Sequence, residues 1–540
     1  MLRVFKYVEL CLYYALILAL CVSRSSGDFG LSAKPSNILV FLPTESKSHF
    51  NGFKPLLQTL VSRGHNLTLV SPLPLDKAEY PYRHVQVEEH VYGKDSKPIA
   101  DGNMLEVAKI INYIPAAVQI CWFGPYISEL TLNKSSVKDF ITNDRSSFDL
   151  VIFENFFHES FVSIGHKYNA PVVQLLPFST NARVSQWHSN PLHPAYITDV
   201  TSFFGSNMTF IQRTTNTLSV LAYTTVNRVI YLYKQNAVMN KYFIYPGHEN
   251  RPDLATMLQN ISLTLINSHP IIGSPVPLVP SYINVAGMHC KPAKELPQDL
   301  KKILDTSERG VVYFSLGSIV QSSKMPKETV SMLLSELSKI EQTVLWKWEA
   351  DDLPQLPKNV IIRKWFPQND ILGHPNCRLF ITHGGVHSTI ESIYHGVPML
   401  AIPVFGDQIG NSLRAQYRGI AIQVPFFELT DQAIGSALHR LLNDPRFAEN
   451  AKRVSAIFRD QPLTPLETAI YWIEYVIRHK GAAHLKTAAN ELNWFQFLLL
   501  DVVLFVLSVV VLTVYTTKKI LVLTFGLCCK RKASIEKKNQ

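Results

Sequence analysis

The chain has 540 residues, too many for a single hydrophobic core, so two domains with additional segments are expected. Its hydrophobic content of 47% and mean hydropathy of +0.07 are high for a soluble enzyme and predict membrane segments. Of the formal net charge of +10, six charges come from the tail after residue 517, with seven Lys and Arg against one Glu. The charge therefore indicates membrane topology and contact with anionic lipid headgroups, and it argues against nucleic acid as a partner.

Residues 1–27 have the pattern of a signal peptide. Arg3 and Lys6 precede an apolar run at 11–22, and small and polar residues follow at 23–27. Glu9 stands just before the apolar run, so an uncleaved membrane anchor is the alternative.

Residues 28–275 are predicted to form a first α/β domain. Hydrophobic runs at 37–42, 67–70, 148–153 and 171–176 predict strands, and apolar residues at helical spacing between 53 and 61 predict a helix that ends at Gly64. Strands that alternate with helices predict a parallel sheet covered on both faces.

Prolines concentrated between 270 and 297 predict a linker over 276–300. A second alternating series, with strands near 311–315, 343–347, 360–363, 379–381 and 399–402, predicts a second domain over 301–490. Two such Rossmann-like domains facing one another would hold a ligand in the cleft between them, at the carboxyl ends of the strands. No G-x-G-x-x-G follows the first strand, which argues against a dinucleotide dehydrogenase.

The segment 365–408 has the parts needed to hold a nucleoside diphosphate attached to a sugar. A strand at 379–382, a His-Gly-Gly turn at 383–385 and a helix at 388–395 form a unit whose helix N-terminus favours an anion. Trp365 offers a π-face to a planar base, and Asp407 and Gln408 suit adjacent sugar hydroxyls.

Each of these features also has a purely structural interpretation. The glycine turn could be a tight connection, Trp365 could be a core residue, and Asp407 and Gln408 could serve the start of a helix. The spacing of Ser388 and Glu391 matches a capping box, which would compete with a ligand for the Glu391 carboxylate.

Residues 495–517 are almost continuously apolar and about long enough to cross a bilayer. Trp494 lies where an interfacial aromatic residue belongs, and Asp501 is expected near the lumenal boundary, where a carboxylate is less costly. The basic tail, 518–540, is predicted to be cytoplasmic, so the body of the protein would be lumenal. Lys537 and Lys538 match a dilysine retrieval signal, with a generic basic tail as the alternative.

Other features agree with a lumenal body. Four glycosylation sequons begin at Asn66, Asn133, Asn207 and Asn260. The cysteines outside the signal and membrane regions are Cys121, Cys290 and Cys377, an odd number without metal-like spacing.

The segment 365–408 resembles the signature segment of the UDP-glycosyltransferases, family 1 of the inverting GT-B enzymes. The F-S-L-G-S run at 314–318 and the H-C-K-P run at 289–292 are similar to that family too, the latter to its insect branch. The resemblance covers essentially the whole chain. It implies an α/β GT-B fold, a single-pass type I protein of the endoplasmic reticulum membrane, and last lumenal helices, near 463–479, that cross back onto the first domain.

The resemblance also implies roles for the residues of a UDP-sugar site. Trp365 would stack on uracil and Gln368 would bind uridine, while Glu391 would hold the ribose hydroxyls. The diphosphate would lie at Ser318 and His383, and the sugar at Asp407 and Gln408. Gly385, His387 and Ser388 complete the expected set. Vertebrate members commonly have Asn at the position of His387, so the chain departs from that pattern here.

For catalysis the resemblance assigns the general base to His49, in the loop after the first strand. The family's usual partner is an Asp, but the matching position here holds Glu154, with Glu159 and Asp149 as weaker alternatives. A carboxylate behind a histidine fixes its tautomer and stabilises the imidazolium. His65 matches a family pattern but starts the second strand, so a structural role is expected.

The predicted reaction is inverting transfer of a hexose from a UDP-sugar to a hydroxyl group of a small lipophilic acceptor. No metal and no cofactor are expected, because UDP is already a good leaving group and the UDP-sugar is a co-substrate. The insect-like character implies glucose rather than glucuronate. A homo-oligomer remains open. The alternatives are a non-catalytic UDP-sugar-binding membrane protein and a transferase that acts on membrane lipid.

Overall fold

The computed structural model describes residues 34–76, 81–88, 103–112, 114, 116–198, 204–205, 207–351, 353 and 355–538. The predicted signal peptide, 1–27, and the last two residues lie outside the described residues.

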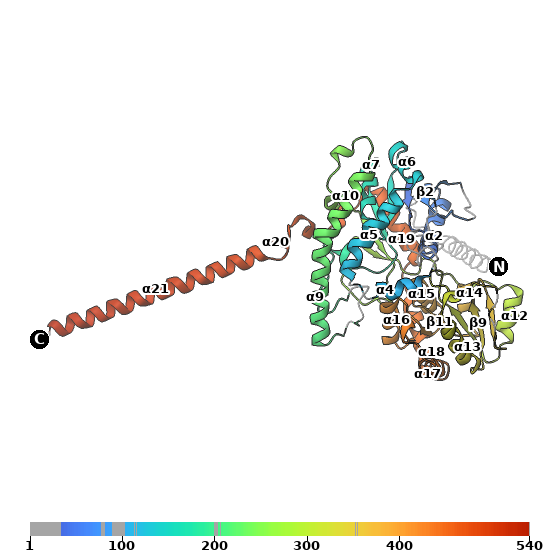
Figure 1. The fold of residues 1–540 in the computed structure, drawn as a ribbon. Helices are drawn as coiled ribbons and strands as arrows, with labels where there is room; N and C mark the ends of the chain where they lie inside the picture. Colours follow the sequence, from blue (N-terminus) through green and yellow to red (C-terminus); the bar gives the residue numbers. More distant parts are fainter. Residues whose placement is uncertain are drawn as a thin grey trace, which may run out of the picture.

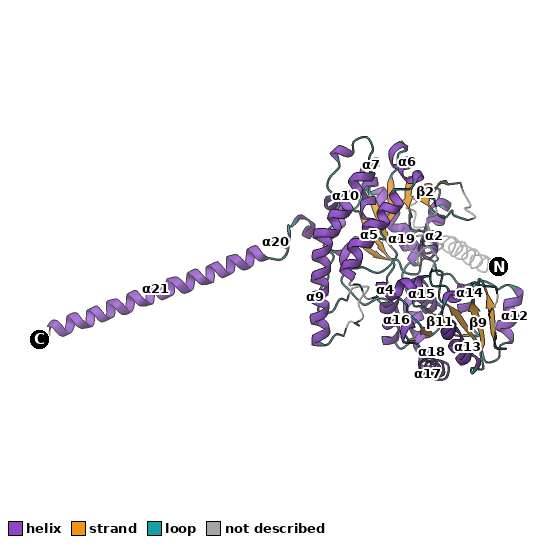
Figure 2. Ribbon diagram, in the orientation of Figure 1, coloured by secondary structure: helices purple, strands orange, loops and turns teal. Residues whose placement is uncertain are grey.

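The body contains two parallel sheets, each enclosed by helices (Figure 2). The first has the order β3-β2-β1-β4-β5-β6-β7, and the second has the order β10-β9-β8-β11-β12-β13. Their strands are β1 Asn37–Phe41, β2 Asn66–Ser71, β3 Arg83–Gln86, β4 Leu150–Glu154, β5 Val172–Leu176, β6 Leu263–Ile266, β7 Tyr282–Asn284, β8 Val311–Ser315, β9 Thr343–Lys347, β10 Val360–Arg363, β11 Cys377–Thr382, β12 Met399–Ala401 and β13 Ala421–Gln423. The strand order reverses direction at β1/β4 and at β8/β11, where crevices for ligands form in such sheets.

The range predicted as a linker, 276–300, contains the short strand β7, which pairs with β6 in the first sheet. The chain just before and just after β7 is irregular, as its proline content indicates. Three residues of strand were too short a signal to recognise among the prolines.

Helices cover both faces of each sheet (Figure 1). In the first domain they are α2 Lys47–Ser62, α5 Ala116–Leu132, α6 Ser135–Asn143, α7 Ser163–Tyr168, α8 Ala182–Ser185, α9 Phe210–Val226, α10 Leu232–Tyr242 and α11 Leu254–Gln259. Helix α4 Met104–Ile111 precedes α5 in the chain, but its Leu105 and Ala108 pack in the core of the second domain. In the second domain they are α12 Gln298–Thr306, α13 Lys327–Ser338, α14 Gln368–Leu372, α15 Val386–His395, α16 Asp407–Tyr417, α17 Asp431–Asn443 and α18 Pro445–Arg459. The next helix is α19 Pro465–Arg478.

Alternate residues of each central strand enter different hydrophobic cores. In β1, Ile38 and Val40 are buried on one face of the sheet, and Leu39 and Phe41 on the other. Because both faces are covered, the central strands are continuous hydrophobic runs rather than alternating ones, and this is why they could be located from the sequence.

Helix α19 returns to the first domain, as the resemblance implied. Its residues Ala469, Ile470 and Ile473 belong to the core that lies beneath α2. Glu474 of α19 is buried and accepts hydrogen bonds from Nε of Arg63 at 2.7 Å and from Nε2 of His65 at 3.5 Å. Burial lowers the pKa of His65, although Glu474 acts in the opposite direction. His65 therefore joins α19 to the first domain.

The C-terminal part is a short helix, α20 (Trp494–Phe497), followed by the long helix α21 (Leu500–Lys538), which projects away from the body (Figure 1). Within the described residues, Leu500–Lys530 is the one helix long and apolar enough to cross a membrane, and it has no buried part. Asp501 lies in its first turn, at the end nearest the body, where the sequence placed it.

Candidate active site

His49 and Glu154 form a buried pair in the first domain. His49 lies in the first turn of α2, which Ser46 caps, and Glu154 is the last residue of β4. Nδ1 of His49 lies 2.6 Å from Oε1 of Glu154, and both side chains are buried. The longer glutamate therefore reaches the histidine from the position where the family usually has aspartate.

This hydrogen bond has a definite electrostatic consequence. Burial acts to raise the pKa of Glu154, but the charge and hydrogen bond of His49 outweigh it, so the pKa lies below its usual value. The carboxylate stays ionised and accepts the Nδ1–H, which leaves Nε2 of His49 as the basic nitrogen.

The two alternative partners are engaged elsewhere. Asp149 accepts a hydrogen bond from the backbone N–H of Asn37 at 2.8 Å. Glu159 is buried and pairs with Arg183 and with the hydroxyl of Tyr231. Of the three carboxylates considered, Glu154 is the one that contacts His49.

Aromatic rings surround the other sides of His49. The rings of Phe156 and Phe178 meet the imidazole edge-on, with centroids 5.0 Å and 5.5 Å away. An apolar wall of this kind beside a base suits a lipophilic acceptor.

The glycine turn of the second domain is built around His383. A Cβ at Gly317 would lie 2.6 Å from the His383 ring, and one at Gly385 would lie 2.5 Å from it. Two glycines, one from the F-S-L-G-S run and one from the His-Gly-Gly turn, therefore make room for a single imidazole. Burial, with a smaller contribution from Lys347, lowers the pKa of His383 to about 4, so the ring is neutral near pH 7.

The helix after this turn begins earlier than predicted. Helix α15 starts at Val386, not at Ser388, and its N-cap is Gly385, which offers no side chain. The capping box suggested by Ser388 and Glu391 is therefore absent. The backbone N–H groups of the first turn consequently have no side-chain cap, the arrangement that favours an anion.

Glu391 instead belongs to a side-chain cluster with Gln368 and Ser388. Nε2 of Gln368, at the start of α14, donates to the Glu391 carboxylate and lies 3.1 Å from Oγ of Ser388. Burial raises the pKa of Glu391 to about 7, and the Gln368 hydrogen bond opposes this only in part. Gln368 and Glu391, two of the three residues predicted for the nucleoside, are thus brought together.

Trp365 is 69% exposed, whereas the next residue, Phe366, is buried. The core-packing interpretation of Trp365 is therefore wrong, because Phe366 fills that place in the core. Ser318 is also exposed, directly after the Gly317 turn. Both side chains are accessible to a ligand.

Asp407 and Gln408 open α16 but have different surroundings. Asp407 accepts a hydrogen bond from Nδ2 of Asn411 at 2.7 Å, and burial raises its pKa. Gln408 is buried, and its carbonyl oxygen accepts the N–H groups of Val404 and Phe405 at 2.9 Å and 3.2 Å. Asp407 lines the interdomain space. The side-chain carbonyl oxygen of Gln408 instead fixes the loop that precedes α16.

His387 points toward the first domain. A Cβ at Gly52 of α2 would lie 2.2 Å from Nε2 of His387, and Nδ2 of Asn267 lies 3.4 Å from the same atom. The ring also meets His289 at a centroid distance of 4.9 Å. These contacts link the two domains and give no support to a phosphate contact by the His387 side chain.

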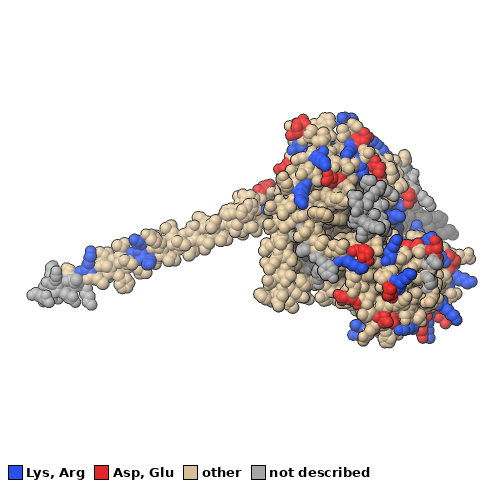
Figure 3. Space-filling model, in the orientation of Figure 1, with Lys and Arg blue, Asp and Glu red and all other residues tan. Residues whose placement is uncertain are grey.

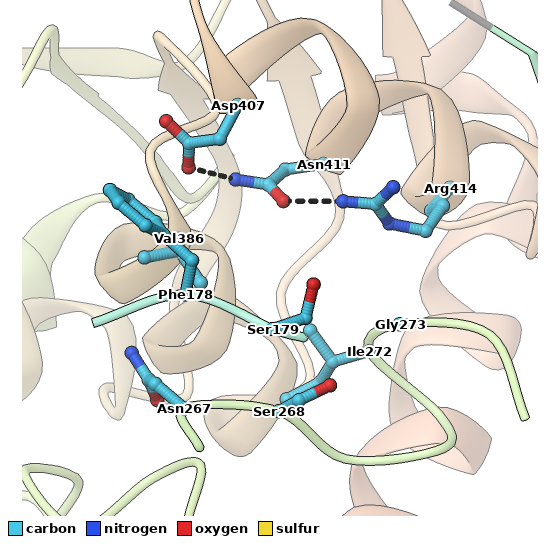
Figure 4. Close-up of a pocket in the computed structure, with 10 residues that line it drawn as sticks. All are labelled: Phe178, Ser179, Asn267, Ser268, Ile272, Gly273, Val386, Asp407, Asn411 and Arg414. Carbon is cyan, nitrogen blue, oxygen red and sulfur yellow. Dashed lines mark hydrogen bonds between the residues drawn. The ribbon is translucent and has the colours of Figure 1, made fainter. Parts of the chain in front are cut away.

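A small pocket opens between the two domains (Figure 4). One wall comes from the segments after β5 and β6, and the other from the starts of α15 and α16. Its lining residues are Phe178, Ser179, Asn267, Ser268, Ile272, Gly273, Val386, Asp407, Asn411 and Arg414. Phe178 lines this pocket and contacts His49, so one side chain separates His49 from the space that Asp407 lines.

The sequence did not single out several of these lining residues. Phe178 and Asn267 come just after the carboxyl ends of β5 and β6, so the strand-end rule could have found them. Asn411 and Arg414 lie one and two turns into α16, on the side of Asp407, and only the helix geometry identifies them.

All four sequon asparagines, Asn66, Asn133, Asn207 and Asn260, are exposed.

Comparisons with known proteins agree with this geometry. A family model described as "UDP-glucoronosyl and UDP-glucosyl transferase" matches residues 37–535. The chain belongs to the UDP-glycosyltransferase family. Among the family's members, the chain is 36% identical to UDP-glycosyltransferase UGT5 of Dactylopius coccus, over 90% of this chain and 92% of that protein. It is 33% identical to UDP-glucuronosyltransferase 2B13 of Oryctolagus cuniculus, over 94% of this chain and 96% of that protein.

The solved structures show the fold. Glycosyltransferase VinC in complex with DTDP superposes with a TM-score of 0.55 at 16% identity, covering 82% of this chain and 100% of VinC. The UDP-glycosyltransferase described here is accordingly a GT-B protein, with two parallel α/β sheets and one apolar C-terminal helix.

Proposed function

We propose that this enzyme transfers glucose from UDP-glucose to a hydroxyl group of a small lipophilic acceptor, with His49 as the general base and without a metal. The observation that carries the proposal is the buried His49–Glu154 pair beside a pocket that Asp407 lines. The body would lie in the lumen of the endoplasmic reticulum, anchored by α21.

In this mechanism the acceptor hydroxyl gives its proton to His49. As the acceptor oxygen attacks the anomeric carbon, Nε2 of His49 takes the hydroxyl proton, and Glu154 stabilises the resulting imidazolium. A new carbon–oxygen bond forms on one face of the sugar, while the bond to UDP breaks on the opposite face, and UDP leaves with the electron pair. The configuration at the anomeric carbon is therefore inverted.

The second domain supplies the groups that receive the leaving UDP. The uncapped N-terminus of α15, the neutral His383 and the exposed Ser318 suit a diphosphate. Trp365 offers its face to uracil, and Glu391 and Gln368 suit the ribose. Asp407 and Asn411 suit hydroxyl groups of the sugar.

The test is an assay of UDP release by microsomes that contain the full chain, with UDP-glucose and a panel of phenols and aliphatic alcohols. We expect release that depends on the acceptor, and we expect His49→Ala to abolish it without changing UDP binding. His439→Ala, on the exposed side of α17, is the matched control. Binding of UDP without acceptor-dependent release would instead identify a non-catalytic UDP-sugar-binding protein, and products found only in the lipid phase would identify a lipid transferase.

Glucuronate is a second candidate for the donor sugar, and Arg414 is the observation that favours it. Its guanidinium lines the interdomain pocket and donates to Oδ1 of Asn411 at 2.7 Å, so a uronate carboxylate could pair with it. Comparison of kcat/KM for the two UDP-sugars decides between them. If glucuronate is the donor, Arg414→Gln lowers glucuronosyl transfer far more than glucosyl transfer.

A further inference from the structure

The first domain contains a buried ion pair close to the candidate base. Charged side chains are scattered over the face of the body that Figure 3 shows, but Arg183 and Glu159 are only 4% and 0% exposed and pair with each other. The hydroxyl of Tyr231, which is also buried, donates to the Glu159 carboxylate. Buried charges are costly even when they are paired, so the contacts of this pair indicate what it does.

The segment that follows β4 contacts His49 with two of its side chains. Glu154, at the end of the strand, makes the 2.6 Å hydrogen bond to Nδ1 of the imidazole. Phe156 meets the same imidazole edge-on, with centroids 5.0 Å apart, and its ring also contacts Phe178 at 5.7 Å. The hydrogen bond and the rings together hold the imidazole in one orientation, as a general base requires.

The other two residues of this segment contact Arg183. Nη1 of Arg183 donates to Oδ1 of Asn155 at 3.1 Å, and Nδ2 of Asn155 donates to Oε1 of Gln174 at 3.0 Å. The guanidinium lies over the ring of Phe157, 4.7 Å from its centroid. Side chains along 154–157 therefore contact the base and Arg183 alternately.

Phe157 has a backbone conformation that needs support. Its φ is 65°, in the left-handed region, and in the described part of the chain it is the one aromatic residue with a positive φ. Its carbonyl oxygen accepts hydrogen bonds from Oγ of Ser128 in α5 at 2.6 Å and from Nε2 of Gln235 in α10 at 2.8 Å. With the Arg183 guanidinium over its ring, Phe157 is held by three elements. Unfavourable backbone persists where its surroundings hold it in this way, and it is common at functional sites.

A second rare backbone feature reaches the same place. Between α9 and α10 the chain forms a π-helical turn, Asn227–Tyr231, a feature that is frequent at functional sites. Tyr231 of this turn holds Glu159, and Nδ2 of Asn227 donates to the backbone carbonyl of Arg183 at 3.3 Å. The turn thus supplies two side chains that fix the ion pair.

We propose that Arg183 is a positioning residue for the transfer reaction. It holds the segment 154–157 from one side and thereby sets Glu154 and Phe156 against His49 on the other. This inference rests on the proposed function of His49 as the general base. Loss of the Arg183 contacts would misplace the imidazole and leave the UDP contacts of the second domain unchanged.

The experiment uses Arg183→Lys in the full chain. Lysine keeps the charge that neutralises Glu159, so the fold is retained, but it lacks the planar fork that reaches Asn155 and covers the Phe157 ring. For each variant, kcat and the acceptor KM are measured with an alkyl alcohol and with 4-nitrophenol at alkaline pH, where the phenol is already ionised. The Kd of UDP and the Tm are measured alongside.

Two other variants complete the set. Gln235→Leu removes a donor to the Phe157 carbonyl and tests the same segment from α10, so the inference stays testable if Arg183→Lys does not fold. Arg251→Lys is the matched control, because Arg251 also lies over an aromatic ring, that of Tyr245 at 5.8 Å.

We expect Arg183→Lys to lower kcat for the alcohol by roughly 10- to 100-fold, because a displacement of about 1 Å at the base suffices for such a loss. Gln235→Leu should lower it by about 2- to 10-fold, as expected for one buried hydrogen bond. The acceptor KM and the Kd of UDP should not change, since the interaction is lost in the transition state. Both losses should disappear with ionised 4-nitrophenol, which has no proton for the base to remove. Arg251→Lys should keep the parent kcat with both acceptors.

Three results would overturn the inference. The first is a parent-level kcat of Arg183→Lys or Gln235→Leu with the alcohol. The second is a raised acceptor KM at unchanged kcat, since Arg183 would then support a binding wall and not the base. The third is an equal loss with both acceptors, or a joint loss of kcat, UDP binding and Tm, since the ion pair would then be purely structural. Each can occur while His49→Ala still abolishes transfer, so the inference can fail without the proposed function. Transfer that survives His49→Ala refutes both.

Discussion

Replacement of Glu154 by Asp, the residue usual in the family, should impair the enzyme. The Oε1–Nδ1 distance to His49 is 2.6 Å. Shortening the side chain by one bond, about 1.5 Å, extends this distance to as much as about 4 Å, beyond hydrogen-bonding range. The pair is buried, so the lost charge-assisted hydrogen bond is worth roughly 2–3 kcal/mol, or a fall in kcat of about 30- to 150-fold.

Glu154→Gln tests the charge separately from the length. It keeps the reach of the side chain but removes the carboxylate that stabilises the imidazolium, at a cost of roughly 4 kcal/mol for an effective dielectric constant near 20. The expected fall in kcat is about 10³-fold.

The assay is kcat at saturating donor and acceptor, with the Kd of UDP measured by calorimetry for each variant. UDP binding should stay within about twofold, because the predicted UDP contacts lie in the second domain. An aspartate variant with a kcat within threefold of the parent enzyme would refute the reasoning, because it would show that the 2.6 Å contact contributes little to catalysis. Equal losses in kcat and UDP binding would show that the pair is structural.

Three further predictions concern the donor site and the return of α19. Trp365→Ala should raise the Kd of UDP by roughly 5- to 150-fold, since we propose that the residue stacks on the base, and it should not lower Tm, since the residue is 69% exposed. An unchanged Kd contradicts this. UDP affinity should increase as the pH rises through about 7, because Glu391 then becomes a carboxylate, which is a better hydrogen-bond acceptor. Calorimetry should show that Glu391→Gln removes this pH dependence. The raised pKa also means that this group lowers the free energy of unfolding as the pH rises from 4.5 toward 7. Glu474→Ala should lower the free energy of unfolding by about 2 kcal/mol, and Tm by a few degrees in a thermal melt, because it leaves buried His65 without its partner. The control, Glu449→Ala at an exposed site, should change neither quantity.

The donor half of the site was largely predictable from the sequence. Apart from Ser318, its candidate residues lie in one segment, 365–408, where strand, turn and helix follow each other, so local geometry brings them together. Two structural alternatives that the sequence left open, core packing of Trp365 and a capping box at Ser388, are ruled out by competition for space. Trp365 is exposed because Phe366 takes the core position, and the capping box at Ser388 is absent because α15 already begins at Val386.

The sequence by itself determined the parallel α/β sheets, the apolar C-terminal helix and the candidate residues for a nucleotide site, because hydrophobic periodicity and strand-end position are local properties. Only the tertiary structure decided what crosses between segments. Glu154 reaches His49 from 105 residues away, His387 docks on Gly52, and Arg414 joins Asn267 around one pocket. The first contact depends on how α2 packs beside β4 within the first domain, and the other two depend on how the two sheets face each other. No local pattern in the chain encodes these placements.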